Sequence, residues 1–252
     1  MKEIKSLQNS LVKHLVKLRK SRSYRSEQGS VVLAGKKLVG EICATSVAIT
    51  LFVEEGASVP ENVLVKDLYI VSNEVMKKVS GLETPESVLA EVNIPSQQSL
   101  KDKCRILVFD GVSDPGNMGT LWRTALALGW DGAFILDNCV DPYNDKTLRS
   151  AKGATFRLPY CVGNFEDFSR LVEENQLQPL VGDIQGKEPG EVSLRKGVAL
   201  VLGNEASGPS SAIKELCESV TIPMDGEMES LNVAVAGGIL MYLLKKEACG
   251  LR

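Results

Sequence analysis

Four short, largely apolar segments in the second half of the sequence constrain the fold more than any other feature. They span residues 105–109, 133–136, 180–184 and 198–202, and helix-like stretches separate them. Strands that are apolar along their whole length must be covered on both faces, which is typical of parallel sheets with helices on either side. We therefore predict an α/β fold with a largely parallel sheet for residues 104–252.

The segments around these strands complete the predicted second domain. Helices are expected at 117–128, 144–151, 165–175 and 209–217, followed by a last strand at 220–222 and a last helix at 231–248. The last helix is apolar almost all round, which indicates extensive burial.

The first part of the chain, residues 1–98, is predicted to form a smaller α/β domain. Strands are expected at 31–34, 47–53, 68–71 and 88–94, and helices at 7–18, 36–44 and 73–80. The polar, basic stretch 19–29 is expected to be a mobile loop. Residues 94–99 contain Pro, Ser and Gln and form the best linker candidate.

Composition excludes several classes of protein. The chain has 252 residues, 44% of them apolar, but no run approaches a membrane span of about 20 apolar residues. Six scattered cysteines without a C-x-x-C pair argue against a zinc site and favour reduced thiols inside the cell. His14 is the only histidine, and among lysines on a predicted surface helix it is a poor candidate for catalysis or metal binding. We expect a soluble, cytoplasmic protein without a metal, or an organellar one if an import segment has been removed.

The charge is unevenly distributed. Residues 1–25 carry eight Lys or Arg and one Glu, a net +7, whereas the whole chain has a net charge of −3. This basic arm fits contacts with nucleic-acid phosphates, although a solvated helix would also account for it. The candidate RNA-binding residues are Lys13, Lys17, Arg19, Lys20, Arg22 and Arg25.

Three polar loops follow predicted strands, and ligands of parallel sheets bind beyond the carboxyl ends of the strands. The first loop, residues 110–124, is rich in Gly, Pro and Asp and leads into a helix that carries Asn117 and Arg123. It fits a phosphate-binding helix N-terminus or an ordinary strand-to-helix turn. It is neither a Walker loop nor a dinucleotide fingerprint.

The second loop, residues 201–209, holds the carboxylate Glu205 between Gly203 and Gly208, which suggests a tight turn or a plain solvated loop. The third loop precedes the last helix and contains Ser230 and Asn232. These residue types are favoured as helix N-caps, and they also suit a ligand site. Together the loops offer polar orienting groups and one cation, which suits a group transfer whose reactive chemistry comes from a cofactor.

The three loops resemble the motifs of the SpoU family in the SPOUT superfamily of RNA methyltransferases. Asp-Pro-Gly-Asn-Met-Gly-Thr-x-x-Arg at 114–123 resembles the first motif, and Leu-Gly-Asn-Glu-x-x-Gly at 202–208 resembles the second. Ile-Pro-Met…Ser-Leu-Asn-Val-Ala-Val-Ala at 222–236 resembles the third, and residues 6–15 resemble the family's N-terminal substrate domain. The resemblance implies S-adenosylmethionine (AdoMet) as cofactor, methyl transfer to a ribose 2′-hydroxyl of tRNA or rRNA, a homodimer and a C-terminal trefoil knot.

The resemblance also implies two sets of site residues. The catalytic set is Arg123, Asn117, Glu205, Ser230 and Asn232. The set that would hold the cofactor is Leu202, Gly203, Asn204, Ile222, Met224 and Leu231. Arg123 would be either the general base for the 2′-hydroxyl or, because free Arg has a pKa above about 12, a cation that stabilises the developing alkoxide.

Two other functions remain open from the sequence. The chain could be a non-catalytic RNA-binding protein that kept the SPOUT fold, or a nucleotide-dependent α/β enzyme acting on small molecules. The first would bind RNA without methylating it, and the second would show no salt-dependent RNA binding.

Overall fold

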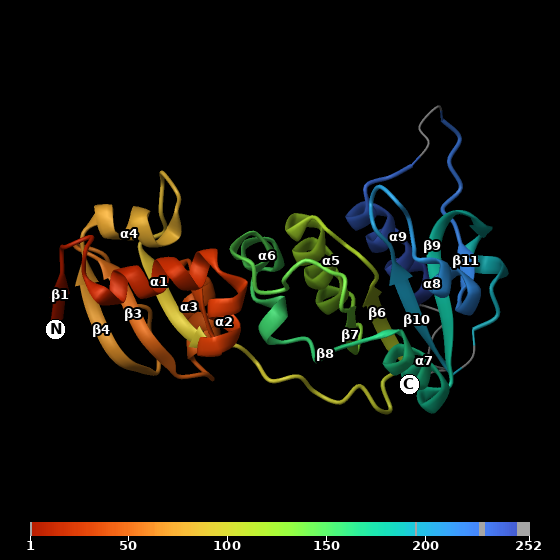
Figure 1. The fold of residues 1–252 in the computed structure, drawn as a ribbon, viewed down its shortest axis with the longest axis horizontal. Helices are drawn as coiled ribbons and strands as arrows, with labels where there is room; N and C mark the ends of the chain where they lie inside the picture. The colour runs from red at the N-terminus through yellow and green to blue at the C-terminus, as the bar shows by residue number, and fades with distance from the viewer. Residues whose placement is uncertain (1, 195, 227–229, 246–252) are drawn as a thin grey trace. The chain divides into compact units, whose positions relative to one another are not determined.

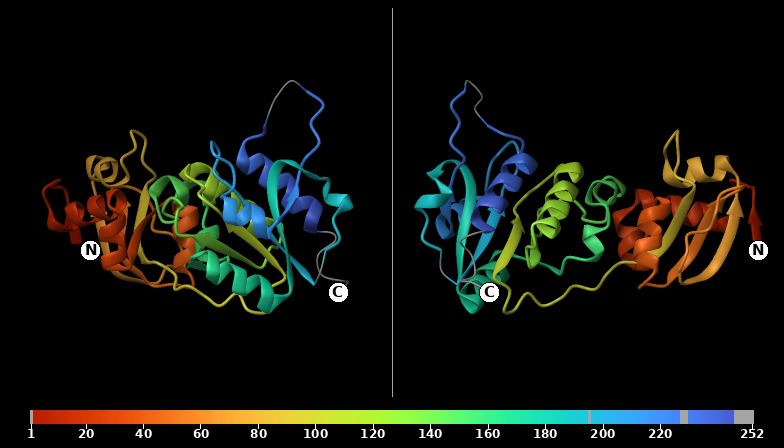
Figure 2. Two further views of the ribbon diagram at one scale, coloured as in Figure 1. Left: turned by 45° about the vertical axis from the view of Figure 1, so that its right-hand side comes forward. Right: turned by 180° about the vertical axis from the view of Figure 1, so that it is seen from behind.

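The computed structural model describes residues 2–194, 196–226 and 230–245, which divide into two compact units. The first unit combines the residues up to Pro95 with Tyr143–Phe156, and the second combines Ser96–Pro142 with the residues from Arg157 onward. Figures 1 and 2 show the elements of both units. Among the described residues, no helix is both long and apolar enough to cross a membrane.

The first unit contains a five-stranded sheet in the order β1-β4-β3-β5-β2. Strands β1, β4 and β3 run parallel to one another, whereas β5 is antiparallel to β3 and β2. Helices α1 and α4 pack together over this sheet, and α3 contacts β2 and β5. The bounds are β1 (Lys2–Ile4), α1 (Ser10–Lys20), β2 (Ser30–Ala34), α3 (Lys36–Cys43), β3 (Ala48–Glu54), β4 (Val65–Val71), α4 (Asn73–Ser80) and β5 (Val88–Asn93).

The amphipathic helix predicted for residues 7–18 is confirmed as α1. Its buried side chains are Val12, Leu15 and Leu18, which join one hydrophobic cluster with residues of α4 and the sheet. His14 was predicted to lie on an exposed helix surface, and this is wrong. Its ring is about one-quarter exposed and lies 3.0 Å from Oε1 of the buried Glu91.

The prediction of a mobile loop for residues 19–29 is wrong, because a second helix, α2 (Arg22–Gln28), forms there. Ser21 caps its start by accepting a hydrogen bond from the Tyr24 backbone N–H, and Gly29 ends it with a φ of 62°. Both are standard capping residues. The helix has no apolar stripe, so hydrophobic periodicity could not reveal it.

One segment of the second half of the sequence groups with the first unit. Helix α6 (Asp145–Ala151) and the short 3₁₀ helix η1 (Ala154–Phe156) belong to it, and α6 contacts strand β2. The buried side chains of α6 include Leu148 and Ala151. A helix of the predicted length is therefore present, but it packs against the sheet of the first unit instead of joining the second.

The second unit contains a six-stranded sheet in the order β11-β9-β10-β6-β7-β8, and every pairing in it is parallel. The predicted α/β fold with a parallel sheet is thus confirmed. Strand bounds are β6 (Arg105–Phe109), β7 (Gly132–Leu136), β8 (Tyr160–Gly163), β9 (Leu177–Lys187), β10 (Gly197–Leu202) and β11 (Glu218–Val220). Helix bounds are α5 (Pro115–Ala127), α7 (Phe165–Asn175), η2 (Pro189–Glu191), α8 (Ser211–Leu216) and α9 (Val233–Lys245).

Helices cover both faces of this sheet. Phe168 of α7 and Ile213 of α8 pack on Val201 of β10 in one cluster. Successive side chains of a strand point to opposite faces, so the neighbouring Leu202 points the other way. It meets α9, where a Cβ on Gly237 would clash with its Cδ1 atom. Helix α9 also packs against α5 on that face.

The last elements differ slightly from their prediction. The last strand ends at Val220, and α9 begins at Val233 because Asn232 caps it. Residues 246–248, which were included in the predicted helix, lie outside the described residues. Nothing in the described residues tests the trefoil knot that the resemblance implies, and it stays a prediction.

Candidate active site

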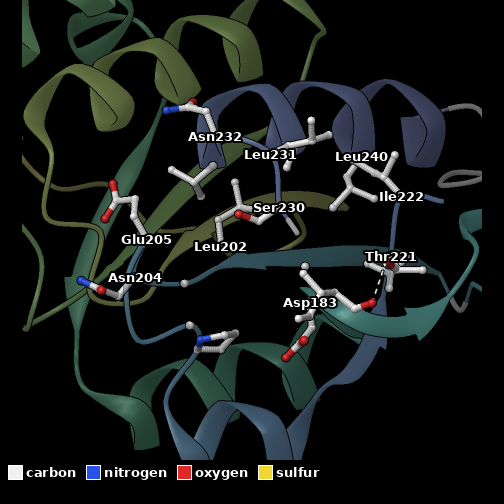
Figure 3. Close-up of a pocket in the computed structure, with 18 of the residues that line it drawn as sticks. Asp183, Leu202, Asn204, Glu205, Thr221, Ile222, Ser230, Leu231, Asn232 and Leu240 are labelled. Carbon is white, nitrogen blue, oxygen red and sulfur yellow. Dashed lines mark hydrogen bonds between the residues drawn. The ribbon is translucent and has the colours of Figure 1, made fainter. Parts of the chain in front are cut away.

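A cleft of about 540 Å³ lies at the carboxyl ends of β9, β10 and β11 in the second unit (Figure 3). Its walls are formed by the loops after β10 and β11, residues 182–184 within β9, and the beginning of α9. This is where parallel α/β sheets bind ligands, and the volume lies within the range of about 300–1,000 Å³ usual for small-molecule sites.

All six residues predicted to bind the cofactor line this cleft: Leu202, Gly203, Asn204, Ile222, Met224 and Leu231. Leu240 of α9 adds a further apolar side chain. Apolar walls with a few polar groups suit the adenine ring of a nucleoside cofactor. Leu231 and Met224 are each more than a third exposed, so apolar surface is available for a ligand to cover.

The loop after β10 turns tightly for two different reasons. Gly208 has a φ of +70°, a conformation that other residues rarely adopt. At Gly203, a Cβ would lie 2.5 Å from the backbone nitrogen of Pro209, so no side chain fits. Asn204 holds the loop from within, since its Nδ2 donates to Gly111 O at 2.8 Å and its Oδ1 accepts from the Ala206 N–H at 2.9 Å.

Three of the predicted catalytic residues, Asn117, Glu205 and Asn232, form a hydrogen-bonded cluster beside the cleft, and a fourth, Ser230, lines the cleft. Asn117 Nδ2 donates to Glu205 Oε1 at 2.9 Å, and Asn232 Nδ2 donates to Asn117 Oδ1 at 3.1 Å. Glu205, Ser230 and Asn232 line the cleft, and Ser113 donates to the other carboxylate oxygen, Oε2, from its backbone and its hydroxyl. Three loops that lie far apart in the sequence thus converge on one hydrogen-bonded cluster.

The carboxylate of Glu205 determines how both amides are oriented. An ionised carboxylate only accepts hydrogen bonds, so Asn117 must turn its NH₂ group toward Glu205 and its oxygen toward Asn232. Asn232 must then donate to Asn117, which leaves its own oxygen to accept from the Ala234 N–H at 2.9 Å and cap α9. Each of the two NH₂ groups keeps a second N–H that could donate a hydrogen bond to a substrate oxygen.

The pKa of Glu205 favours this arrangement. Burial alone would raise the pKa of this carboxyl, but hydrogen bonds from Asn117 and Ser113 outweigh that effect and lower the pKa below its usual value. Glu205 is therefore ionised at neutral pH.

Arg123, the fifth predicted catalytic residue, does not join the cluster. It lies on α5 with an exposed side chain and is not among the residues that line the cleft. At 3.6 residues per turn it points about 120° away from Asn117 around the helix axis. Within one chain, the structure brings together the polar residues of the predicted set but leaves its cation on a neighbouring surface.

The predicted RNA-binding residues divide into two kinds. Lys13, Lys17, Lys20 and Arg22 have exposed side chains on α1 and α2, whereas Arg19 is partly buried. Arg25 does not fit the prediction: it is 4% exposed, and its Nη1 donates to the backbone oxygens of Leu18 and Arg19. The guanidinium thus donates to backbone carbonyls at the end of α1, and Arg25 stabilises the turn between α1 and α2.

Sequence reasoning missed two features of the site. Ser113 fixes Glu205, and Asp183 lines the cleft with a carboxylate that lies 3.0 Å from the ammonium of Lys214. Asp183 lies near the carboxyl end of the predicted strand 180–184. Polar residues at the carboxyl ends of strands identified the other three loops, so the same criterion could have identified Asp183. Among the described residues, no cluster of three or more His, Cys, Asp or Glu side chains could hold a metal ion.

The fold and the cleft define an α/β protein with a site that suits a nucleoside ligand, and comparison with known proteins identifies its family. The SpoU rRNA Methylase family matches residues 105–242, and the MRM3-like substrate binding domain matches residues 9–90. Because the first match covers more than half of the sequence, the chain belongs to the SpoU rRNA methylase family.

Individual relatives cover nearly the whole chain. It is 31% identical to the 23S rRNA (guanosine(2553)-2′-O)-methyltransferase RlmP of Bacillus subtilis (strain 168), over 97% of this chain and all of that protein. The crystal structure of an AdoMet-bound rRNA methyltransferase from Sinorhizobium meliloti is similar with a TM-score of 0.86 and 26% identity, over 99% of both chains. An RNA 2′-O ribose methyltransferase structure has a TM-score of 0.82 at 27% identity, over 97% of this chain and 98% of that one. The prediction of an AdoMet-dependent RNA methyltransferase is confirmed.

Proposed function

We propose that this protein methylates a ribose 2′-hydroxyl of large-subunit ribosomal RNA. The observation that carries the proposal is the chain of hydrogen bonds Glu205–Asn117–Asn232, at 2.9 and 3.1 Å, beside a cleft that suits a nucleoside cofactor. Support for rRNA comes from the family and from the name of RlmP, a 23S rRNA methyltransferase that this chain matches over its full length.

The residues of the cleft fit AdoMet, which supplies an activated methyl group when bound. Leu202, Ile222 and Leu231 would cover the adenine, and the tight turn at Gly203 lets the backbone approach the ligand closely. Asn117 and Asn232 would use their remaining N–H groups to hold the ribose 2′-oxygen in line with the methyl group. Such positioning accounts for a large part of catalysis in transfers between two bound reactants.

Arg123 lies outside the cleft of its own chain, so it could reach a target ribose only at a site to which a second copy contributes. A homodimer would provide such a site. Helix α9 exposes an apolar stripe, Val235, Ile239 and Tyr242, at the spacing of one helix face, and α9 packs against α5, which carries Arg123. Exposed apolar stripes of this kind mark protein contacts. We therefore propose that a second copy covers this face, next to Arg123.

The exposed cations of α1 and α2 would contact the RNA backbone. Phosphate contacts of this kind give affinity that falls with salt but carries little sequence specificity. Because the relative RlmP is a bacterial rRNA methyltransferase, we propose that this protein likewise acts in the cytoplasm.

The proposal is tested with tritiated AdoMet and rRNA from cells that lack the protein. Purified wild-type protein should transfer label to large-subunit rRNA, and the labelled nucleotide should resist alkaline hydrolysis because its 2′-oxygen is blocked. Asn117→Ala should transfer little, whereas Glu174→Gln on the outer helix α7 serves as a control at wild-type rates. RNA binding without any transfer would favour the non-catalytic alternative, and transfer to a base would contradict the ribose assignment.

The homodimer is tested separately by sedimentation. The wild-type protein should sediment as a dimer, and Ile239→Asp should shift it toward the monomer. A wild-type monomer at micromolar concentration would contradict the proposed association.

A further inference from the structure

Asp183 and Lys214 form an ion pair in a part of the cleft that the proposed chemistry does not use. Their charged atoms, Oδ2 and Nζ, lie 3.0 Å apart, and both residues line the cleft. In the view of Figure 3, Asp183 lies across the pocket from Asn232 and Glu205. The pair therefore faces the part of a bound ligand that is far from Asn232 and Glu205, where the substrate hydroxyl is proposed to react.

The two partners differ in their exposure to water. The side chain of Asp183 is 13% exposed, whereas that of Lys214 is 49% exposed. A carboxylate withdrawn from water needs hydrogen-bond donors. Lys214 supplies one of them, and the backbone N–H of Gln185 supplies another at 3.2 Å to Oδ1. Each carboxylate oxygen can accept a further hydrogen bond.

We propose that Asp183 accepts hydrogen bonds from the ribose hydroxyls of the AdoMet bound in this cleft. The proposal rests on the proposed function and adds a cofactor-recognition residue outside the three motifs. The next residue along the chain is Ile184, and Ile222 and Leu240 line the same cleft, so an adenine ring and its ribose would meet apolar and acceptor groups together.

Charge and solvation favour the ribose over the amino-acid part of the cofactor. The charge of Asp183 is already balanced by Lys214, and a largely buried acceptor suits neutral hydroxyl donors. The α-ammonium and α-carboxylate groups would lose more hydration on entering the same place. The pKa of Asp183 agrees with this role: burial would raise it, but hydrogen bonds from Gln185 and Lys214 lower it overall. Asp183 is therefore ionised at neutral pH and accepts at both oxygens.

The test measures binding without RNA, by calorimetry on the full chain. The ligands are S-adenosylhomocysteine, 5′-methylthioadenosine, which lacks the amino-acid part, and the 2′,3′-dideoxy form of 5′-methylthioadenosine. Asp183→Ala should weaken the first two by the same factor, about tenfold to hundredfold for lost hydrogen bonds to a charged acceptor. Binding of the dideoxy ligand should change little.

Two further variants keep the result interpretable. Asp183→Asn preserves the size of the side chain and should give a smaller loss with the same ligand pattern. Glu218→Gln removes another ion-paired carboxylate, the partner of Lys187, on a strand of the same sheet, and should leave all three affinities unchanged.

Three outcomes would overturn the proposal. They are unchanged affinity in both Asp183 variants, a loss confined to S-adenosylhomocysteine, and an equal loss for the dideoxy ligand. A wild-type protein that binds none of the ligands would overturn the cofactor site together with this proposal. Failure to methylate RNA would leave the binding result intact, so the two failures are distinguishable.

Discussion

Asn232 combines two roles that substitution can separate, one in stability and one in the site. Its Oδ1 accepts from the backbone N–H groups of Ala234 and Val235, at 2.9 and 3.4 Å, and caps α9. Its Nδ2 donates to Asn117 Oδ1 at 3.1 Å and so joins the cluster beside the cleft. Asn232→Ala removes both interactions, whereas Asn232→Asp keeps the cap and removes only the donor.

The two variants should therefore differ in stability and agree in activity. Loss of an N-cap costs about 1 kcal/mol, which lowers the Tm of a domain of this size by roughly 2–4 °C. Asp is as good a cap as Asn, and its charge is favourable at a helix N-terminus, so Asn232→Asp should melt within about 1 °C of the wild type.

Methyl transfer should fall in both variants by about tenfold or more, the value of a lost orienting hydrogen bond. In Asn232→Asp, Asn117 cannot recover by turning over, because its oxygen would then face the carboxylate of Glu205. The assays are thermal unfolding and tritium transfer to rRNA. Full activity in Asn232→Asp would refute the role of the amide in the site, and an unchanged Tm in Asn232→Ala would refute the cap.

The remaining predictions concern the cation, the cofactor wall, the carboxylate and the arm. Arg123→Ala should abolish methyl transfer but leave calorimetric affinity for AdoMet within a few-fold, and a large loss of affinity would move Arg123 into the cofactor pocket. Leu231→Arg should block AdoMet binding, and unchanged affinity would contradict the assignment of the third motif. Because the pKa of Glu205 is lowered in the folded protein, its contribution to stability and activity should be complete above the ordinary value of 4.5 and be lost as the pH falls through the lowered pKa; a decline that begins well above pH 4.5 would contradict this. Arg25→Ala should lower the Tm, whereas Lys20→Ala should weaken RNA binding at low salt without changing the Tm, and the reverse pattern would refute the division between buried and exposed cations.

The sequence contained enough information for the sheet of the second unit and for the convergence of its three loops. Short apolar segments such as 198–202 are typical of strands covered on both faces, and the carboxyl ends of parallel strands lie at one edge. Glu205 and Asn232 were therefore expected near each other, and their shared contact with Asn117 follows from the fold.

The errors have physical causes that pattern reading does not capture. Helix α2 is held by its two caps and by Arg25, a polar residue whose burial depends on the carbonyls at the end of α1. Asp183 stood inside an apolar strand segment and was read as part of it. The exposure of Arg123 follows from the rotation of α5 relative to the cleft, and spacing in the sequence cannot fix that rotation.

The central claim is that this chain methylates a ribose 2′-hydroxyl of rRNA. The most direct measurement maps alkali-resistant linkages in large-subunit rRNA from cells with the protein, without it, and with Asn117→Ala restored in its place. We predict that one linkage is resistant only in cells that carry the wild-type protein. Identical maps in all three strains, or a linkage that Asn117→Ala restores fully, would contradict the claim.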